Sequence, residues 1–255
     1  MIETAQAFGV DIGGSGIKAA PVDLTKGDFA EPRLKILTPE VSTPQAVAKI
    51  VKQQLDHFEV PESAPVGIAF PAPIKPGQKL DFMANLDQSW IGVDVTEVFS
   101  EACGRPVVVV NDADAAAWPK SSSVPPRAQD GLVIATTLGT GIGTALIYNG
   151  VLIPNTELGH IILSAKHLDA EKYASSAIRE NEELGYKKWA KRLTKYYGLM
   201  EKYFNPDLFT VGGGVSRQSE KFLPYVDIKT PIVPAKLRNQ AGIVGAAYYA
   251  STKQQ

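Results

Sequence analysis

Three glycine-rich turns in the sequence have the residue types that bind phosphate groups. They are Gly13-Gly14-Ser15-Gly16, Gly139-Thr140-Gly141 and Gly212-Gly213-Gly214. Turns without side chains let backbone N–H groups approach phosphate oxygens, and Ser15 and Thr140 add hydroxyl donors. Each turn by itself is more typical of an ordinary hairpin, in which glycine supplies a positive φ. None is a Walker loop or a dinucleotide fingerprint, but the three together favour a phosphate ligand.

Two carboxylates lie at the ends of apolar runs that predict buried strands. Asp11 lies near the end of the run Ala7–Ile12 and is suited to hold Mg²⁺ through water. The alternative is that Asp11 caps the turn. Asp112 follows four valines, where a charge is costly unless it faces a cleft. It could accept the proton of a sugar hydroxyl while Asn111 fixes a neighbouring hydroxyl. An Asx cap on the helix from Ala113 is equally compatible with Asp112.

Glu157 and His160 place a carboxylate and an imidazole three residues apart. In a helical or tightly turned segment the two side chains point the same way. Both groups suit hydrogen bonds with vicinal sugar hydroxyls. A metal site would need more ligands, and a lone histidine is more often structural.

A third kind of candidate is the basic face of the amphipathic helix expected from Lys187 to Phe204. Its cations include Lys188, Lys191, Arg192 and Lys195. Such a face is usually only solvated. The alternative is a track for a polyanion that extends out of the active site.

The elements expected to position these residues form two similar α/β units. Strands are expected at residues 7–12, 17–23, 33–38, 66–70, 107–110, 132–137, 142–148 and 208–211, and helices at 43–58, 94–102, 113–117, 187–204 and 241–250. The pattern of strand, glycine turn and returning strand occurs near both Asp11 and Thr137, which indicates an internal repeat. We expect a small lobe of residues 1–112 plus 241–255 and a large lobe of residues 113–240.

Composition limits the classes of function. The chain has 255 residues, 44% of them hydrophobic, and a formal net charge of −1. That charge argues against general nucleic-acid binding, which needs a basic surplus. Cys103 is the single cysteine, so no intramolecular disulfide forms. No signal segment or apolar run of about 20 residues is present, so we expect a soluble, cytoplasmic protein without a membrane partner.

The motifs resemble, in the same order, those of the ROK sugar kinases. They are Asp11-Ile-Gly-Gly-Ser-Gly-Ile-Lys18, Asn111-Asp-Ala-Asp114, Leu138-Gly-Thr-Gly-Ile-Gly143, Glu157-Leu-Gly-His160 and Gly212-Gly-Gly-Val-Ser216. Three further segments resemble the polyphosphate-using glucokinases of that family: Ala84-Asn-Leu-Asp-Gln-Ser-Trp-Ile-Gly92, Pro154-Asn-Thr-Glu-Leu-Gly-His160 and Ala241-Gly-Ile-Val-Gly-Ala-Ala247. The resemblance spans nearly the whole chain.

The resemblance implies a two-lobed, actin-like ATPase fold of the ribonuclease H type, a duplication with a central cleft. It implies a Mg²⁺-dependent kinase and homodimer that phosphorylates the 6-hydroxyl of glucose from polyphosphate, ATP or both, with mannose as an alternative sugar. Asp112 matches the catalytic base. The matching sugar-binding positions are Asn85, Asn111, Glu157, His160 and Glu171. The matching donor-binding positions are Asp11, Gly13, Gly14, Ser15, Lys18, Gly139, Thr140, Gly141, Gly212, Gly213 and Gly214.

The sequence departs from the family pattern in ways that matter for function. Many ROK proteins carry a cysteine cluster for structural zinc after the Gly-His pair, and no cysteine lies between His160 and Glu171, so we expect no zinc there. The turn at Pro71-Ala72 and the segment Trp118–Ser123 also differ. Two rival functions remain open: a sugar-sensing protein of the same fold with weak catalysis, and an actin-like assembly ATPase.

Overall fold

The computed structural model divides the chain into two compact units. One comprises residues 1–121 with 240–255, and the other comprises residues 122–239. The residues described are 6–75, 77–83, 86–117, 131–163, 168–235 and 240–253. The lobes expected from the sequence, residues 1–112 plus 241–255 and residues 113–240, stay a prediction.

The first unit is built on a mixed sheet with the strand order β3-β2-β1-β5-β6, and β4 also pairs with β2. The strands are β1 (Gln6–Gly13), β2 (Gly16–Asp23), β3 (Asp28–Phe29), β4 (Leu34–Ile36), β5 (Val66–Phe70) and β6 (Val108–Asn111). β1 and β2 form an antiparallel hairpin, whereas β1, β5 and β6 run parallel. All residues of β5 are buried, as expected for a central strand that is covered on both faces.

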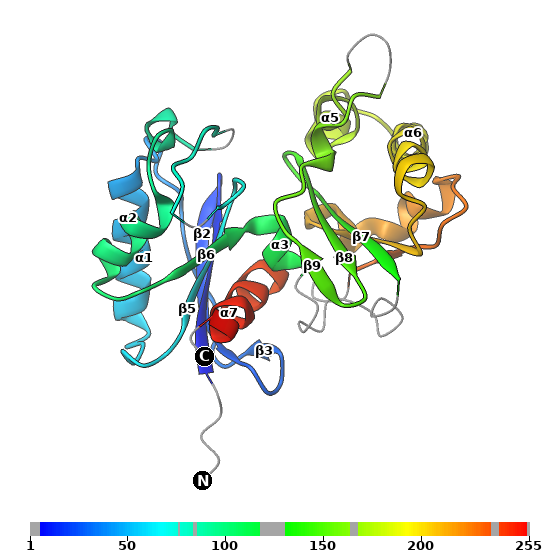
Figure 1. The fold of residues 1–255 in the computed structure, drawn as a ribbon. Coiled ribbons are helices and arrows are strands. Elements are labelled where there is room, and N and C mark those ends of the chain that lie inside the picture. The colour runs from blue at the N-terminus through cyan, green and yellow to red at the C-terminus, as the bar shows by residue number, and fades with distance from the viewer. Residues whose placement is uncertain are drawn as a thin grey trace. The chain divides into compact units, whose positions relative to one another are not determined.

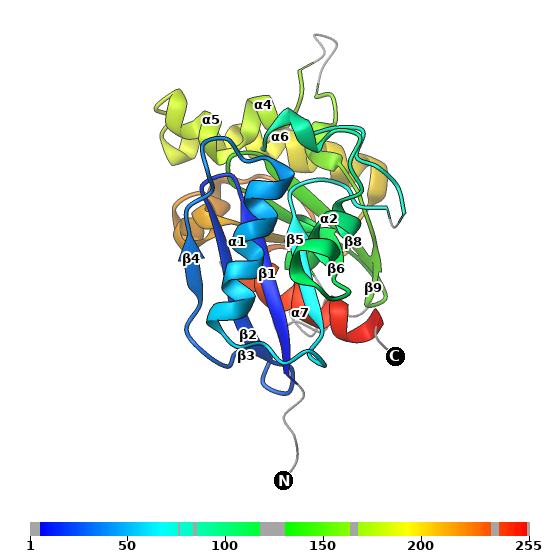
Figure 2. The same ribbon diagram turned by 90° about the vertical axis from the view of Figure 1, so that its left-hand side faces the viewer.

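Helices cover both faces of this sheet (Figure 1). α1 (Pro44–His57) and α2 (Val95–Cys103) lie on one face, and α7 (Ala241–Lys253) lies on the other, as Figure 2 also shows. α3 (Asp112–Ala116) continues directly from β6, and a short 3₁₀ helix, η1, spans Gln88–Trp90. The Thr43 hydroxyl caps α1 by accepting from the amide of Ala46 at 3.3 Å, and proline occupies the first turn.

The backbone of α7 lies in direct contact with the backbones of β5 and α3, because glycines leave room at both contacts. A Cβ on Gly67 of β5 would lie 1.9 Å from the carbonyl oxygen of Ala246. A Cβ on Gly245 of α7 would lie 1.7 Å from the carbonyl oxygen of Ala115. The end of the chain therefore completes the unit that the beginning of the chain started.

The second unit contains a five-stranded sheet with the order β11-β10-β7-β8-β9. The strands are β7 (Leu132–Leu138), β8 (Ile142–Tyr148), β9 (Val151–Ile153), β10 (Leu208–Gly212) and β11 (Ile232–Pro234). The helices are α4 (Glu171–Ala174), α5 (Ser176–Asn181) and α6 (Tyr186–Phe204), and the 3₁₀ helices are η3 (Leu158–His160), η4 (Gly214–Lys221) and η5 (Leu223–Tyr225). The apolar face of α6, with Trp189, Leu193 and Tyr197, joins Ile134 and Phe209 of the strands in one core.

The strands and helices expected from periodicity are confirmed, with shifts of one to three residues at their ends. β3, β9 and β11, which span only two or three residues each, were not expected, and neither were α4 and α5. Ala72, at the altered turn after β5, is 5% exposed and belongs to the core of the first unit. The altered segment Trp118–Ser123 lies outside the described residues. Among the described helices, none combines the length and apolarity that a membrane crossing requires.

Candidate active site

The parallel strands of the first unit bring two predicted site residues to the same edge of the sheet. Asp11 of β1 pairs with Ala69 of β5, and Phe70 of β5 pairs with Asn111 at the end of β6. β1 and β6 are separated only by β5, so Asp11 and Asn111 lie on the order of 10 Å apart across the sheet. Carboxyl ends of parallel strands are the usual place for ligands in open α/β sheets.

Asp11 forms an ion pair with Lys18 on the neighbouring strand. The Lys18 ammonium lies 3.0 Å from Oδ2 of Asp11, and the two residues are directly paired across the hairpin. Among the described residues none donates a hydrogen bond to Oδ1 of Asp11. Gly242 at the start of α7 lies beside this carboxylate, since its Cβ would be 3.4 Å from Oδ1. One partly exposed carboxylate suits Mg²⁺ that keeps most of its water and is otherwise bound by substrate phosphates.

The structure shows which of the two residues Asn111 and Asp112 caps the helix that follows. The Asn111 side chain is the helix cap, because its Oδ1 accepts from the amides of Ala113 at 2.9 Å and Asp114 at 3.2 Å. Asn111 is only 5% exposed. Asp112 is the first residue of α3 and half-buried, and its Oδ1 accepts from the amide of Ala113 at 2.8 Å. The capping role therefore belongs to Asn111, which leaves Asp112 at the helix N-terminus.

The first glycine turn is a two-residue hairpin loop. Gly13 pairs with Gly16, and Gly14 and Ser15 between them are exposed. The expectation that these glycines supply a positive φ is wrong, because none of them is among the residues with positive φ. A Cβ on Gly16 would lie 2.4 Å from Cε of Lys35, the end of a flexible side chain that can move aside.

The second glycine turn is held by Glu171, which the resemblance had assigned to the sugar. Glu171 accepts from the amide of Ile142 at 2.9 Å through Oε2. A Cβ on Gly141 would lie 2.1 Å from the same oxygen. Gly141 therefore lets the carboxylate approach the turn, whereas Thr140 is exposed.

The third glycine turn lies beside the second one in the second unit. Gly212 ends β10 and pairs with Thr137 of the parallel strand β7. Gly213 has a φ of 82°, and its Cβ would lie 2.4 Å from the carbonyl oxygen of Leu138. A positive φ and a close backbone contact both require glycine here. Two predicted phosphate turns thus meet at the carboxyl ends of β7 and β10.

Glu157 and His160 lie together around η3, as the sequence predicted for a tight turn. Oε2 of Glu157 lies 4.0 Å from Nε2 of His160. Gly159 between them packs on β8, because its Cβ would lie 1.9 Å from the carbonyl oxygen of Ile142. Ile142 therefore contacts both the Glu157–His160 turn, through its carbonyl oxygen, and Glu171, through its amide.

Burial and neighbouring charges change the proton affinity of both groups. Burial raises the pKa of Glu157, with the Glu171 carboxylate adding to the rise and His160 opposing it. Burial lowers the pKa of His160, but the hydrogen bond that its ring makes to Asp169 and the negative charges of Glu171, Asp169 and Glu157 outweigh it, so the pKa is raised. The histidine thus lies in a negative environment.

Asp169 is a site residue that the sequence analysis missed. Its Oδ2 lies 3.0 Å from Nδ1 of His160, and its Oδ1 accepts from the amide of Glu171 at 2.9 Å. An Asp shortly before a helix is a typical capping residue, but no helix was expected here, because α4 is only four residues long. The histidine contact depends on chain pairing that no local pattern reveals.

A comparison with protein families identifies the chain. The model of the ROK family matches residues 7–172, which is more than half of the chain. The chain belongs to the ROK family. The resemblance stated from the motifs is thereby confirmed.

Individual ROK relatives agree with this assignment. The polyphosphate glucokinase of Mycobacterium tuberculosis (strain CDC 1551 / Oshkosh) is 43% identical over 94% of this chain and 89% of that protein. The solved inorganic polyphosphate/ATP-glucomannokinase from Arthrobacter sp. strain KM is 40% identical, with a TM-score of 0.90 over 98% of this chain and 99% of that one. A ROK glucokinase from Streptomyces griseus, solved with glucose and AMPPNP, is 25% identical, with a TM-score of 0.81 over 97% of this chain and 99% of that one. The predicted actin-like ATPase fold is confirmed.

Two expectations from the sequence stay predictions: the contact of Asn85 with the sugar, and the absence of zinc. Asn85 falls outside the described residues. Among the residues that the structure describes, no three His, Cys, Asp or Glu side chains form a group able to hold a metal ion. That result does not test the expected absence of zinc, and water-mediated Mg²⁺ at a single carboxylate needs no such group.

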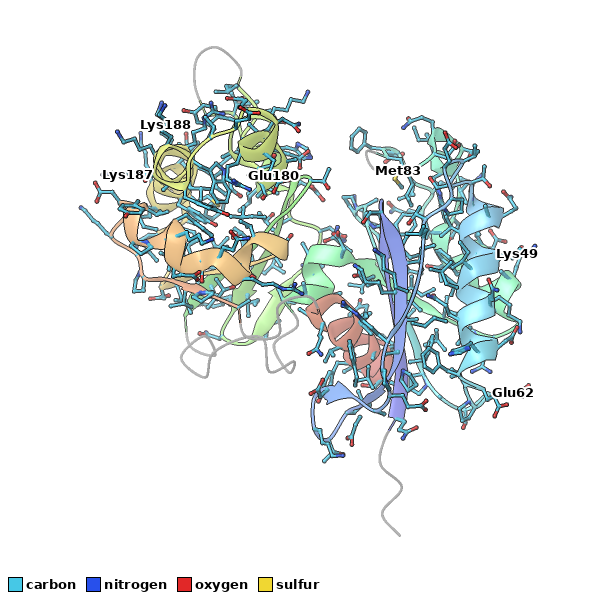
Figure 3. The ribbon with its side chains drawn as sticks, turned by 180° about the vertical axis from the view of Figure 1, so that it is seen from behind. Lys49, Glu62, Met83, Glu180, Lys187 and Lys188 are labelled. Carbon is cyan, nitrogen blue, oxygen red and sulfur yellow. The ribbon has the colours of Figure 1, made fainter. Side chains whose placement is uncertain are left out.

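The basic face of α6 is smaller than the sequence suggested. Arg192 is engaged within the unit, because Nη1 donates to the carbonyl oxygen of Tyr173 at 3.0 Å and Nη2 lies 2.5 Å from a Glu182 carboxylate oxygen. Lys195 is exposed, with its ammonium 5.5 Å from the Tyr173 ring centroid. Lys188 and Lys191 are exposed on α6, where Figure 3 labels Lys188. The lysines rather than Arg192 are available to a polyanion.

Proposed function

We propose that the chain is a glucokinase that transfers a phosphoryl group from inorganic polyphosphate or ATP to the 6-hydroxyl of glucose. The observation that carries this proposal is Asp112, a half-buried carboxylate at the carboxyl end of β6 whose helix-capping duty is taken by Asn111. The activity agrees with the names of the ROK relatives that share about two fifths of its sequence.

Asp112 serves as the general base. It orients the 6-hydroxyl and accepts its proton as the oxygen attacks phosphorus, while the bond from phosphorus to the donor's bridging oxygen breaks. The transition state of phosphoryl transfer is loose, so positioning and electrostatics dominate the catalysis. A positioned base contributes about 100- to 10,000-fold to the rate.

The sugar-binding residues of the proposal are Asn85, Asn111, Glu157, His160 and Glu171. Glu157 and His160 are well supported, because two hydrogen-bonding groups lie 4.0 Å apart and are partly exposed. Asn111 and Glu171 also have structural duties, as a helix cap and as an acceptor for the Ile142 amide. Their substitution will therefore affect folding as well as glucose binding.

The donor is bound by the glycine turns with Lys18. The backbone amides at Gly13–Gly16, Gly139–Gly141 and Gly212–Gly214 would face phosphate oxygens. Asp11 would hold Mg²⁺ through water, and the bound ion would neutralise charge that develops on the donor. Lys188, Lys191 and Lys195 would extend the donor site for a long polyphosphate. Arg192 would instead hold α6 to neighbouring segments through Tyr173 and Glu182.

The finer parts of the proposal concern sugar range and assembly. The Arthrobacter relative is named a glucomannokinase, which supports mannose as a second substrate. We include a homodimer and a cytoplasmic location, both expected from the sequence. Size-exclusion chromatography with light scattering tests the dimer.

The experiment that tests the function is a coupled assay for hexose 6-phosphate. Glucose and mannose are each supplied with polyphosphate or with ATP, in the presence and absence of Mg²⁺. We expect glucose 6-phosphate with at least one donor and no product without the divalent ion. A protein that binds glucose but forms no product with either donor would be a sensing protein. Nucleotide hydrolysis and polymerisation without a sugar would indicate an assembly ATPase.

A further inference from the structure

The two carboxylate oxygens of Asp169 have separate duties. Oδ1 accepts from the amides of Glu171 at 2.9 Å and Lys172 at 3.3 Å, which caps the start of α4. Oδ2 lies 3.0 Å from Nδ1 of His160. The Asp169 side chain is 21% exposed, whereas the His160 side chain is 39% exposed. One residue therefore connects the histidine to the N-terminus of α4.

The backbone holds this connection in place. Ile162 and Asp169 form an antiparallel bridge, and the amide of Ala170 donates to the carbonyl oxygen of Ile161 at 3.0 Å. His160 lies two residues before Ile162, and Glu171 lies two residues after Asp169. Glu171 in turn accepts from the amide of Ile142 at the second glycine turn. Asp169 is thus the central residue of a chain of contacts from His160 to that turn.

The Asp169 carboxylate determines which nitrogen of the imidazole carries the proton. An ionised carboxylate has only acceptors. Oδ1 accepts two amide protons, and Oδ2 faces His160 as a further acceptor. The ring must then donate from Nδ1, and in the neutral imidazole Nε2 is left as an acceptor. Nε2 points towards the Glu157 side, 4.0 Å from Oε2. Two acceptors side by side suit two hydroxyl donors of one sugar.

We propose that Asp169 is a positioning residue that holds the His160 ring in its Nδ1–H form, so that Nε2 accepts a hydrogen bond from a sugar hydroxyl. This inference rests on the proposed function, in which His160 contacts glucose. Asp169 itself touches neither glucose nor the reacting atoms.

The substitution Asp169→Asn tests the inference with little change in shape. The amide oxygen of asparagine must continue to accept from Glu171 and Lys172, so its NH₂ group faces Nδ1 of His160. An NH₂ donor requires a bare Nδ1, which moves the ring proton to Nε2. The same exchange of an aspartate for asparagine beside a catalytic histidine traps the wrong tautomer in serine proteases.

The chain supplies a matched control in Asp94. Its Oδ1 accepts from the amides of Thr96 at 2.9 Å and Glu97 at 3.2 Å, the same capping pattern as that of Asp169, and neither of the two histidines that the structure describes is hydrogen-bonded to it. Asp94→Asn should therefore reproduce any effect of the cap on stability. It should leave the His160 ring and the glucose kinetics unchanged.

The first readout is the ¹⁵N chemical shift of the imidazole nitrogens by NMR, which distinguishes the two neutral tautomers. The chain has three histidines, and His160→Gln assigns the signals of His160. We expect Nδ1–H in the wild type and in Asp94→Asn, and Nε2–H in Asp169→Asn. An Nε2–H ring in the wild type, or the same tautomer in all three proteins, overturns the inference.

The second readout is steady-state kinetics with glucose. An acceptor replaced by a donor against the same hydroxyl should raise KM for glucose by about 10-fold or more, with a smaller change in kcat. If the tautomer changes in Asp169→Asn and KM stays at the wild-type value while His160→Gln raises it, the positioning role is overturned. If His160→Gln also leaves KM unchanged, the sugar role of His160 is refuted, and with it the part of the proposed function on which the inference depends.

Discussion

Asn111 and Asp112 show how adjacent side chains share structural and chemical work. Both could cap the following helix, and the backbone selects the first, because Asn111 takes the extended conformation of an N-cap and its side chain accepts two amides. Asp112 then begins the helix, and its carboxylate follows the end of β6, the position that we propose for the general base.

The substitution Asp112→Asn should lower kcat by at least about 100-fold, since it removes the proton acceptor and keeps the size of the side chain. KM for glucose should change little, because the amide still hydrogen-bonds the hydroxyl. Kinetics with saturating donor measures both. Asp28→Asn, at an exposed carboxylate of β3, is the control. A fully active Asp112→Asn protein would rule out the base assignment.

His160 predicts a pH dependence of folding stability. Burial lowers its pKa, but the hydrogen bond with Asp169 and three nearby carboxylates raise it above 6.5. Because the folded protein then binds the proton more tightly than the unfolded chain, this contribution to stability is complete below about pH 6.5. It is lost as the pH rises through the higher pKa of the folded state.

Urea unfolding between about pH 5.5 and about pH 8.5 measures this contribution. The free-energy difference between the wild type and His160→Gln should be largest at the acid end and shrink towards the alkaline end. A difference that stays constant or grows with pH contradicts the predicted direction.

At the scale of elements, the sequence pattern predicted most strands and helices because hydrophobic period and caps are local signals. Thr43-Pro44 begins α1, and the four valines mark β6. The two- and three-residue strands β3, β9 and β11 were missed, since so short a run has no period. The role of the glycines in the first hairpin was mispredicted, because none of them has a positive φ.

Gly159→Ala should destabilise the second unit and displace the Glu157–His160 turn. The added Cβ would lie 1.9 Å from the carbonyl oxygen of Ile142, a backbone atom that cannot move aside alone. Overpacking of this kind costs about 1–3 kcal/mol. Urea unfolding gives the loss of stability, and KM for glucose should rise with it.

Gly198→Ala is the matched control for that measurement. Gly198 lies within α6, and its Cβ would meet nothing within 4 Å. Alanine in a helix is favoured over glycine by about 0.5–1 kcal/mol, so this variant should be as stable as the wild type or more stable. Equal stability of the two variants would show that the close contact at Gly159 is not rigid.

At the scale of the whole molecule, the family motifs predicted the fold, whereas the contacts that hold the candidate site residues in place depend on long-range pairing. That Glu171 holds the second glycine turn, and that Asp169 holds His160, follows from contacts between segments separated by 29 and 9 residues. No local pattern contains such contacts. The engagement of Arg192 with Glu182 and Tyr173 likewise could not be read from the helical period.

The preference for polyphosphate over ATP should depend on the exposed lysines of α6. Replacing Lys188 and Lys191 together with glutamine should raise KM for a long polyphosphate by about 2- to 10-fold, the effect of two exposed charges. If α6 is a track for long donors only, KM for ATP should stay within error. Added salt should weaken polyphosphate use in the wild type more than in this variant.

The control for that pair is Lys49→Gln with Lys229→Gln, two exposed lysines of which one lies on α1 and the other lies between η5 and β11 (Figure 3 labels Lys49). It removes the same charge from other parts of the surface. Equal losses with polyphosphate and ATP, or equal effects of the two pairs, would show that α6 provides no track.

The position of the transferred phosphoryl group tests the central claim most directly. Phosphorus NMR of the product formed from glucose, with coupling to the sugar protons resolved, identifies the oxygen that attacked. The account predicts a phosphate coupled to the two protons on C6, formed with polyphosphate, ATP or both. A phosphate on the anomeric oxygen, or release of orthophosphate with no sugar phosphate, would contradict it.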